Sequence, residues 1–266
     1  VDNIDEIIDA SYGIMIARGD LGIEVAQEKI PGIQREIIRK CVLKKKPVIV
    51  ATQMLHSMIS NPRPTRAEVT DIANAVFSNT DALMLSGETA SGKYPVEAVT
   101  TMASIAEQAE KDRWRMNSFQ IPMSENCSQK EFLAHAAIDA TIRLGVAGII
   151  ADSMTGEVVR YLASFRGPKP ILAICYREKT QRLLNLSYGV IPISQHQTKS
   201  SEYIFTAALR MLRQKGYLTL DDKIAYLSGN LGLAAGTTFL EINPVRKVFE
   251  NIDYFHLPQY SDKRIE

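Results

Sequence analysis

The sequence is poor in the residues that mark several protein classes. It has three cysteines, one tryptophan and four histidines among 266 residues. Because the cysteines Cys41, Cys127 and Cys175 are odd in number and not closely spaced, they argue against a disulfide framework or a zinc site. The histidines are scattered, so the sequence contains no visible histidine metal cluster. We therefore expect a protein of the reducing cytoplasm.

An excess of one charge and long apolar runs are also missing. Lys and Arg number 31 against 30 for Asp and Glu, giving a net charge of +1. A near-neutral chain gives no reason to expect binding to nucleic acid or to a membrane surface, and no apolar run is long enough to span a bilayer. The chain has neither a signal peptide nor an initiator Met and opens on a helical pattern, VDNIDEIIDAS, so we expect it to be a piece of something longer.

Three short apolar runs stand out in the first hundred residues. They are GIMIA, PVIVA and ALML, which begin at Gly13, Pro47 and Ala82. Their second residues lie 34 and 35 residues apart, and each run is apolar on both faces, as in a strand buried on both sides. Residues 33–46 and 66–78 carry apolar positions at helical spacing. This alternation predicts a parallel sheet. A helical repeat is the alternative, but the segments do not resemble one another and the runs are too short for helices.

Polar residues follow each apolar run. They are Arg18-Gly19-Asp20, Thr52-Gln53 and Ser86-Gly87-Glu88. In parallel α/β folds, and in (β/α)8 barrels especially, chemistry takes place at the C-terminal ends of the strands. One polar strand end would be explained by loops being polar, whereas three at one edge predict a site. Because three strand–helix units cannot close a barrel, we expect about five further strands upstream.

The second half of the chain predicts a separate α/β domain. A long amphipathic helix covers residues 94–111, and the stretch after it mixes Pro, Ser, Asn and charges without periodicity, as in a linker. We therefore expect barrel material over residues 1–112, a linker over 113–129 and an α/β domain over 130–266. Helical patterns alternate there with five strand patterns, at residues 147–151, 169–175, 189–194, 223–228 and 237–242.

Four blocks carry a resemblance to a known family. They are ARGDLG from Ala17, KPVIVATQML from Lys46, NPRPTRAEVTDIANAVF from Asn61 and LMLSGETASGKYP from Leu83. In order and approximate spacing they resemble pyruvate kinase, over its last three barrel strands and, more loosely, its C-terminal domain. The resemblance implies an α/β fold, a partial (β/α)8 TIM barrel followed by a separate α/β domain. It also implies a glycolytic kinase that transfers a phosphoryl group from phosphoenolpyruvate to ADP, giving pyruvate and ATP.

The resemblance implies roles for residues at the strand ends. Asp20 matches the carboxylate that holds a divalent cation, Mg²⁺ or Mn²⁺, and the N–H groups of Gly19 and Asp20 match donors to the substrate carboxylate. Thr52 matches a hydroxyl beside the substrate's methylene carbon, and Ser86 matches a hydroxyl near the proton relay. Independently, Mg²⁺ favours one or two carboxylates, and glycine lets a backbone approach an anion closely. The alternatives are an Asp20 that caps a turn and a Thr52 hydroxyl bonded to backbone.

Other residues of these blocks are expected to support the site rather than to meet the substrate. We expect Arg18 to form a structural ion pair, and Glu24 and Glu88 to hold loops. His56 departs from the family, in which an acidic residue is common.

The family's catalytic lysine, second metal carboxylate, nucleotide residues and K⁺ site lie upstream of this chain, and no Lys-Ile-Glu block occurs. We therefore expect this chain alone to be inactive.

The C-terminal domain of the family often binds a phosphorylated effector between a Ser/Thr-rich turn and a glycine-rich loop. Here Glu157 and Val158 stand where many effector-binding members have a basic and then a small residue, and a carboxylate in the first helical turn repels phosphate. An N-cap followed by an acid explains the turn without any ligand. The alternative function is thus a regulatory or oligomerisation module, and the family implies a homotetramer. The matching effector residues are Ser153, Thr155, Gly156, Gly232 and Gly236.

Arg18-Gly19-Asp20 read alone suggests an adhesion motif. That function requires the tripeptide to be exposed on a loop of an extracellular protein. The free cysteines, the missing signal segment and the apolar run directly before Arg18 all count against it.

Overall fold

The computed structural model describes residues 1–115, 121–195, 201–229 and 236–255. The chain divides into two compact units, which are treated separately below. In the described residues, no helix combines the length and the apolar character needed to cross a membrane. The first unit comprises Val1–Pro122 with Leu186–Tyr188, and the second comprises Met123–Asn185 with Gly189–Glu266.

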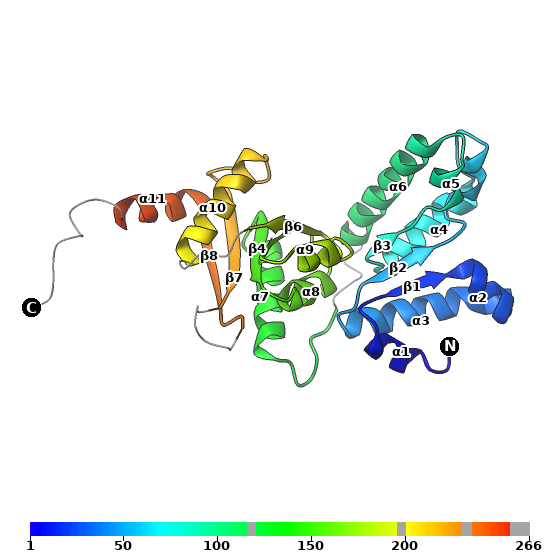
Figure 1. Ribbon diagram of the computed structural model, residues 1–266, viewed down its shortest axis with the longest axis horizontal. Coiled ribbons are helices and arrows are strands. Elements are labelled where there is room, and N and C mark those ends of the chain that lie inside the picture. Colours follow the sequence, from blue (N-terminus) through cyan, green and yellow to red (C-terminus); the bar gives the residue numbers. More distant parts are fainter. Residues whose placement is uncertain (116–120, 196–200, 230–235, 256–266) are drawn as a thin grey trace, which may run out of the picture. The chain divides into compact units, whose positions relative to one another are not determined.

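The first unit is built on three parallel strands in the order β1-β2-β3, labelled in Figure 1. The register pairs Ile14 with Val48, and Val50 with Leu83. The three apolar runs are therefore confirmed as neighbouring parallel strands, although the third strand is shorter than its apolar run. The strands are β1 (Ile14–Ala17), β2 (Val48–Ala51) and β3 (Ala82–Leu83).

Helices connect these strands, and the two amphipathic segments between them are confirmed as helices. At the start of α4, the Thr65 hydroxyl accepts from the Glu68 N–H, and the Glu68 carboxylate accepts from the Thr65 N–H. This capping box satisfies two backbone donors that a helix start leaves open. The helices are α1 (Ile4–Ala10), α2 (Arg18–Glu24), α3 (Ile30–Leu43), α4 (Arg66–Phe77), α5 (Gly87–Ala90) and α6 (Pro95–Arg115), with short 3₁₀ turns at Gln27–Lys29 and His56–Ile59.

Helix α6 extends into the segment expected to be a linker. Residues 113–115 were expected to lie outside regular structure, but they continue α6 to Arg115. The physical reason is that Arg113 is 4% exposed and donates to the Asn79 Oδ1 atom over 2.8 Å. A buried, hydrogen-bonded guanidinium fixes the last turn of the helix to the first unit.

The three-stranded sheet is covered more fully on one face than on the other. Ile16 and Val50, which face the helices, are buried, while Met15 on the opposite face is 51% exposed. Met15, Ile49 and Ala82 share that face because the parallel register aligns them. In the described part of the chain, β1 and β3 are the edge strands of this sheet. This is the geometry of an open segment of a barrel, with the barrel-interior face partly bare.

The second unit is an α/β domain with a five-stranded sheet in the order β6-β5-β4-β7-β8. Four strands are parallel, and β8 pairs antiparallel with β7. All five expected strands are confirmed, as are the helical segments between them. The strands are β4 (Gly148–Ser153), β5 (Ile171–Cys175), β6 (Val190–Ser194), β7 (Lys223–Ser228) and β8 (Phe239–Pro244). The helices are α7 (Gln129–Arg143), α8 (Glu157–Ser164), α9 (Glu178–Leu184), α10 (Ser201–Gln214) and α11 (Val245–Phe255).

The core of the second unit lies between the sheet and its helices. Leu172 and Ile174 of β5 pack in one buried cluster with Leu209 of α10 and Val245 of α11. Helix α7 packs against α8 and β7. Cys175 of β5 is buried in this core, and Cys41 of α3 is buried in the first unit. No cysteine forms a disulfide in the described residues.

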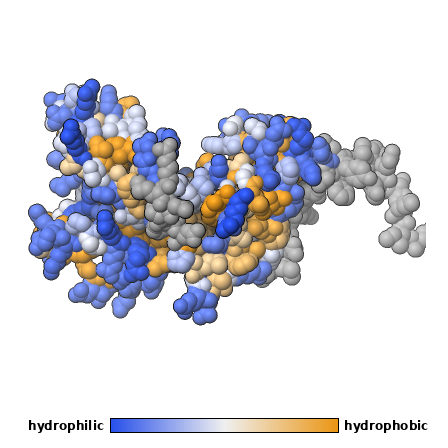
Figure 2. All heavy atoms as spheres, turned by 180° about the vertical axis from the view of Figure 1, so that it is seen from behind, coloured by the Kyte–Doolittle hydropathy of each residue, from blue (hydrophilic) through white to orange (hydrophobic). Residues whose placement is uncertain are grey.

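Some large apolar side chains remain at the surface. Val96 and Val99 of α6 are 73% and 53% exposed, and Phe132 of α7 is 55% exposed. Figure 2 shows apolar patches between hydrophilic side chains on one face of the molecule. Single exposed apolar residues are common on soluble proteins and assign no function by themselves.

Candidate active site

Polar residues follow β1, β2 and β3 at one edge of the first sheet. Because the strands are parallel and in register, their carboxyl ends lie together. Helix α2 begins at Arg18 directly after β1, so Gly19 and Asp20 lie in its first turn and are exposed. Thr52 comes directly after β2, and Ser86 is the N-cap of α5.

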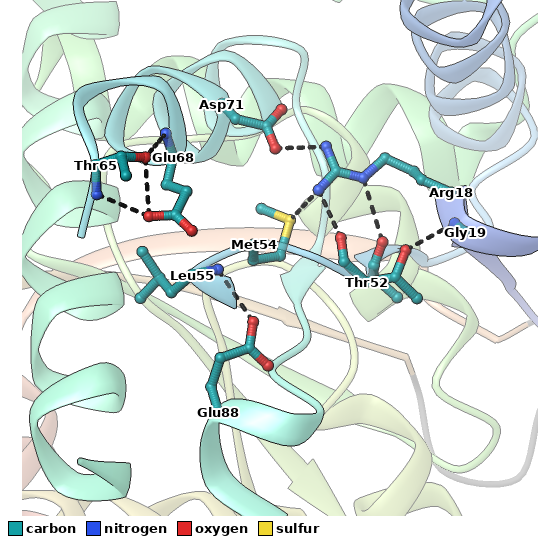
Figure 3. Close-up of polar contacts among 10 residues, drawn as sticks. Arg18, Gly19, Thr52, Met54, Leu55, Thr65, Glu68, Asp71 and Glu88 are labelled. Atoms are coloured by element: carbon teal, nitrogen blue, oxygen red, sulfur yellow. Dashed lines mark hydrogen bonds and ion pairs between the residues drawn. The ribbon is translucent and has the colours of Figure 1, made fainter. Parts of the chain in front are cut away.

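Gly19 and Thr52 are in direct contact. The Gly19 N–H donates to the Thr52 Oγ1 atom over 3.0 Å (Figure 3). The Thr52 hydroxyl is therefore bonded to backbone, as in the alternative interpretation of this residue. The hydroxyl accepts this bond and keeps its own hydrogen to donate. An atom added at the Gly19 Cβ position would lie 3.8 Å from the same hydroxyl oxygen, so the two residues are closely apposed.

Arg18 fixes the turn after β2 to the middle of α4, and the expected ion pair is confirmed. Its guanidinium contacts the Asp71 carboxylate at 2.6 Å. It also donates to the carbonyl oxygens of Ala51, over 3.3 Å, and Thr52, over 2.7 Å, and to the Met54 Sδ atom over 2.9 Å. Figure 3 shows the guanidinium between these groups. The planar fork of arginine suits such a set of acceptors better than an ammonium group does.

The turn that Arg18 holds has an unusual backbone. Thr52 and Gln53 have φ angles of 69° and 55°. This left-handed region is uncommon for residues other than glycine, and for a β-branched residue it is an outlier. Such conformations persist only where the surroundings fix them, and they cluster at functional sites. The Arg18 and Gly19 hydrogen bonds to Thr52 supply that fixation.

Glu88 joins the ends of β2 and β3, which confirms its expected loop-holding role. The side chain is 2% exposed. One carboxylate oxygen accepts from the Leu55 N–H over 3.1 Å, and the other accepts from the Ser86 N–H over 2.8 Å. In the described residues Ser86 makes no direct hydrogen bond to Asp20 or Thr52, and Glu88 connects it instead to the Leu55 N–H beyond β2.

Glu68 is a supporting residue that the sequence prediction missed. Besides capping α4, its carboxylate accepts from the N–H and the hydroxyl of Ser57, over 2.7 and 2.6 Å. Burial alone would raise the pKa of Glu68, but the hydrogen bonds from Ser57 and Thr65 outweigh it and lower the pKa. The Thr-x-x-Glu spacing at Thr65 is the sequence signal that could have found the cap. The bonds to Ser57 have no such signal.

The residues present do not make a complete metal site. No three His, Cys, Asp or Glu side chains come together to hold a metal ion in the part of the chain that the structure describes. Asp20 is an exposed carboxylate at the strand ends and offers at most one side-chain ligand. A divalent cation would need its remaining oxygen ligands from water, substrate or other protein segments.

The second unit brings most of the predicted effector residues together at the start of α8. The Ser153 hydroxyl accepts from the Gly156 N–H over 2.8 Å, and the Thr155 hydroxyl accepts from the Glu157 N–H over 3.4 Å. Gly156 has a φ of 79°, which favours glycine at this turn. Gly232 lies outside the described residues.

Lys130 connects this turn to the glycine-rich loop. Its Nζ atom contacts the Glu157 carboxylate at 2.6 Å, and its side chain lies against Gly236. The pair neutralises the Lys130 ammonium group, so a phosphate at the turn would have to compete with Glu157 for it. The hydroxyls of Ser153 and Thr155 are bonded within the chain, as expected if the turn caps the helix and binds no ligand.

A partly buried acid, Asp152, lies near this turn and was not predicted. Asp152 precedes Ser153 at the end of β4 and accepts from the Ser228 hydroxyl over 3.2 Å. Burial raises the pKa of Asp152, and the hydroxyls of Tyr176 and Ser228 act in the opposite direction. The two strands involved, β4 and β7, flank the point where the strand order reverses, which is where open α/β sheets bind ligands.

Comparison with known proteins places both units in one family. The family description "Pyruvate kinase, barrel domain" matches residues 1–99, and "Pyruvate kinase, alpha/beta domain" matches residues 131–242. The chain is 45% identical over 250 residues to a pyruvate kinase of Borreliella burgdorferi, covering 92% of this chain and 52% of that protein. It is 42% identical to one of Clostridium acetobutylicum, covering 90% of this chain and 50% of that protein.

The fold is similar to that of a solved relative. The crystal structure of a pyruvate kinase from Cryptosporidium parvum matches with a TM-score of 0.81 at 33% identity. The match covers 91% of this chain and 49% of that one. The chain spans about half the length of the curated relatives it matches.

Proposed function

Because this chain belongs to the pyruvate kinase family, we propose that the ends of β1, β2 and β3 form part of a phosphotransferase active site. The reaction is transfer of a phosphoryl group from phosphoenolpyruvate to ADP, giving pyruvate and ATP. The observation that carries the proposal is the strained Thr52–Gln53 turn, held by Arg18 and Gly19 beside the exposed Asp20. Strain that is fixed by hydrogen bonds supports a functional role for this turn.

Phosphoryl transfer requires positioning and charge neutralisation more than covalent help from the protein. Asp20 supplies one carboxylate oxygen for a Mg²⁺ or Mn²⁺ ion, which when bound would neutralise charge on the transferred group. Thr52 donates its hydroxyl hydrogen toward the substrate while accepting from Gly19. Because the Gly19 N–H is engaged in this bond, a substrate carboxylate at that position requires the bond to be shared or exchanged. Ser86, held through Glu88, lies at the end of the third strand.

This part of the site is not sufficient for catalysis. The described residues hold no cluster of three potential metal ligands, and the sequence contains no Lys-Ile-Glu block to supply a catalytic lysine and second carboxylate. A single carboxylate binds a divalent cation weakly, since most of its ligands must come from elsewhere. We therefore propose that the purified chain by itself has no turnover. A tetrameric state, a K⁺ requirement and a cytoplasmic location remain predictions for the full-length enzyme.

The alternative, a regulatory module that binds a phosphorylated effector, has less support. Within the predicted turn, the Ser153 hydroxyl accepts a hydrogen bond from the Gly156 N–H, and Glu157 forms an ion pair with the nearby Lys130. The comparisons do not favour this alternative over the enzyme.

Binding of Mn²⁺ tests the role given to Asp20 without requiring activity. Water-proton relaxation of Mn²⁺ with the purified chain should reveal weak binding that Asp20→Asn removes. Asp2→Asn, which also neutralises an exposed aspartate, is the matched control and should leave that binding unchanged. Equal Mn²⁺ binding by wild type and Asp20→Asn would remove Asp20 from the proposed site.

A further inference from the structure

Asp71 lies in the middle of α4, away from the residues that follow the three strands. Its carboxylate contacts the Arg18 guanidinium, with 2.6 Å between the Oδ2 and Nη1 atoms. In the described residues Asp71 makes no hydrogen bond to Gly19 or Thr52. Any influence of Asp71 on the strand ends therefore passes through Arg18.

Thr52 is held at two atoms by two consecutive residues. The Arg18 Nη2 group donates to the Thr52 carbonyl oxygen over 2.7 Å, and the Gly19 N–H donates to the Thr52 hydroxyl oxygen over 3.0 Å. The first bond fixes the backbone and the second fixes the side chain. Thr52 has a φ of 69°, which a β-branched residue rarely adopts, so losing the carbonyl bond removes part of what maintains this conformation. The direction of the Thr52 hydroxyl thus depends on where the guanidinium lies.

Asp71 supplies the negative charge beside this guanidinium. The other acceptors are neutral, namely the carbonyl oxygens of Ala51 and Thr52 and the Met54 Sδ atom. Across the described ranges, Asp71 is the one acidic side chain that forms an ion pair with Arg18. The Arg18 side chain is 14% exposed, and a cation so far removed from water needs a counter-charge. Without the carboxylate, the guanidinium gains free energy by turning toward water and away from the carbonyl oxygen.

The shape of the guanidinium transmits this charge to Thr52. The Nη1 group donates to Asp71 and the Nη2 group donates to the Thr52 carbonyl oxygen, as Figure 3 shows. Because the guanidinium is planar and rigid, a carboxylate that fixes one arm also fixes the direction of the other. An amide at position 71 could still accept a hydrogen bond, but a charge-assisted bond is roughly twice as strong. The arrangement therefore requires the charge of Asp71 as well as its shape.

We propose that Asp71 is a positioning residue of the proposed phosphotransferase site. It holds the Arg18 guanidinium on the Thr52 carbonyl oxygen, and in this way it sets where the Thr52 hydroxyl points. The contact of this hydroxyl with substrate rests on the proposed function, whereas the control of Thr52 by Asp71 does not.

Nuclear magnetic resonance of the purified, isotope-labelled chain tests the placement without any activity. Asp71→Asn should move the Thr52 carbon signals, which depend on φ and ψ, and the Gly19 amide signal, which reports the bond to Thr52. Asp71→Glu keeps the charge and should return both signals toward their wild-type positions. Asp139→Asn removes the carboxylate of another aspartate–arginine pair, formed with Arg143 at 2.7 Å in α7, and should leave both signals unchanged.

Ser57 separates positioning from a general loosening of α4. Its N–H donates over 2.7 Å to Glu68, which lies three residues before Asp71 on the same helix. We expect the Ser57 amide signal to stay in place in Asp71→Asn, whereas a loosened helix would move it as much as the Thr52 signals. Asp71→Ser, a second neutral variant, repeats the comparison if Asp71→Asn does not fold. The proposal is overturned if the neutral variant leaves Thr52 unchanged, if Ser57 moves as much as Thr52, or if Asp71→Glu moves Thr52 as far as Asp71→Asn does.

A kinetic measurement connects the placement to the proposed function. It uses a co-purified complex of the chain and the segment of the Borreliella burgdorferi relative that the chain leaves unmatched. Asp71→Asn should lower kcat by about tenfold or more and change the KM for phosphoenolpyruvate less, because misplacing a group near the reacting atoms acts mainly on the transition state. Asp71→Glu should recover part of the lost kcat. An active complex whose kcat is indifferent to Asp71→Asn would overturn the positioning role. An inactive wild-type complex would count against the proposed function alone, since the resonance signals decide the role of Asp71 separately.

Discussion

The Arg18 guanidinium donates to the Thr52 carbonyl oxygen over 2.7 Å, and Thr52 is held in the left-handed region with a φ of 69°. The same guanidinium contacts Asp71 of α4 at 2.6 Å. One side chain thus joins the end of β1, the turn after β2 and the following helix. The residues proposed to meet substrate are positioned by this contact set rather than by the strands alone.

Replacing Arg18 with lysine should destabilise the first unit. A lysine keeps the charge but cannot bridge two carbonyls and a carboxylate, so we expect a loss of about 2–3 kcal/mol in the free energy of unfolding. Urea denaturation measures the change. Arg66→Lys, at the exposed first residue of α4, is the matched control and should change stability little. Equal stabilities of the two variants would show that Arg18 does not fix the turn.

Gln53 offers a direct test of the backbone strain. Its φ is 55° and its side chain is exposed, so a substitution there changes the backbone preference more than packing. Glycine adopts this region freely, whereas alanine does not. We expect Gln53→Gly to be more stable to urea than Gln53→Ala by about 1 kcal/mol. The reverse order, as in an ordinary strand or helix, would contradict a strained turn.

Much of this arrangement could be predicted from the sequence, because periodicity and strand ends are local signals. The runs at Ile14, Val48 and Ala82 gave the strands and the edge at which Asp20, Thr52 and Ser86 lie. Contacts between distant residues have no such signal. The sequence does not reveal that Arg18 reaches Asp71 or that Glu88 reaches Leu55. The left-handed Thr52–Gln53 turn was also missed, because neither residue favours that region.

The end of α6 shows the same limit at a domain boundary. Residues 113–115 lack apolar periodicity and were expected in a linker, yet they are helical. The hydrogen bond from Arg113 to Asn79 is a tertiary contact, and it outweighs the weak local preference. Uneven burial of the two faces of the sheet, with Met15 half exposed, likewise follows from which strands are present rather than from local sequence.

Glu68 should make stability depend on pH in the acid range. Its pKa is below its ordinary value of 4.5, so its contribution is complete above that pH and is lost as the pH falls through the folded-state value. At neutral pH, Glu68→Gln should lose about 1–2 kcal/mol, because a capping box and the Ser57 bonds weaken. The difference from wild type should shrink as the pH falls to about 3. Urea denaturation across this range measures it.

Glu97→Gln is the matched control for Glu68. Glu97 is an exposed acid in the first turn of α6. Its replacement should cost less than that of Glu68 at neutral pH, since it removes a dipole interaction without a cap. A difference between Glu68→Gln and wild type that stays constant with pH would rule out the carboxylate as its source.

Glu157 should oppose phosphate binding at the start of α8. Glu157→Gln removes a like charge and releases Lys130, which it contacts at 2.6 Å. We expect affinity for a sugar bisphosphate to rise about tenfold, read as a larger thermal shift at a fixed ligand concentration. Glu178→Gln, an acid in the first turn of α9, is the control and should behave like wild type. If no sugar phosphate or nucleotide shifts wild type or Glu157→Gln, the effector prediction fails.

The central claim is that this chain carries one part of a pyruvate kinase active site, with Asp20 among its functional groups. The most direct measurement is phosphoenolpyruvate-dependent phosphorylation of ADP. The assay compares the purified chain alone with a co-purified complex of the chain and the segment of the Borreliella burgdorferi relative that it leaves unmatched. We predict no turnover by the chain alone, turnover by the complex, and a loss of about a hundredfold on Asp20→Asn. Turnover by the chain alone, or a co-eluting complex that is inactive or indifferent to Asp20→Asn, would contradict the claim.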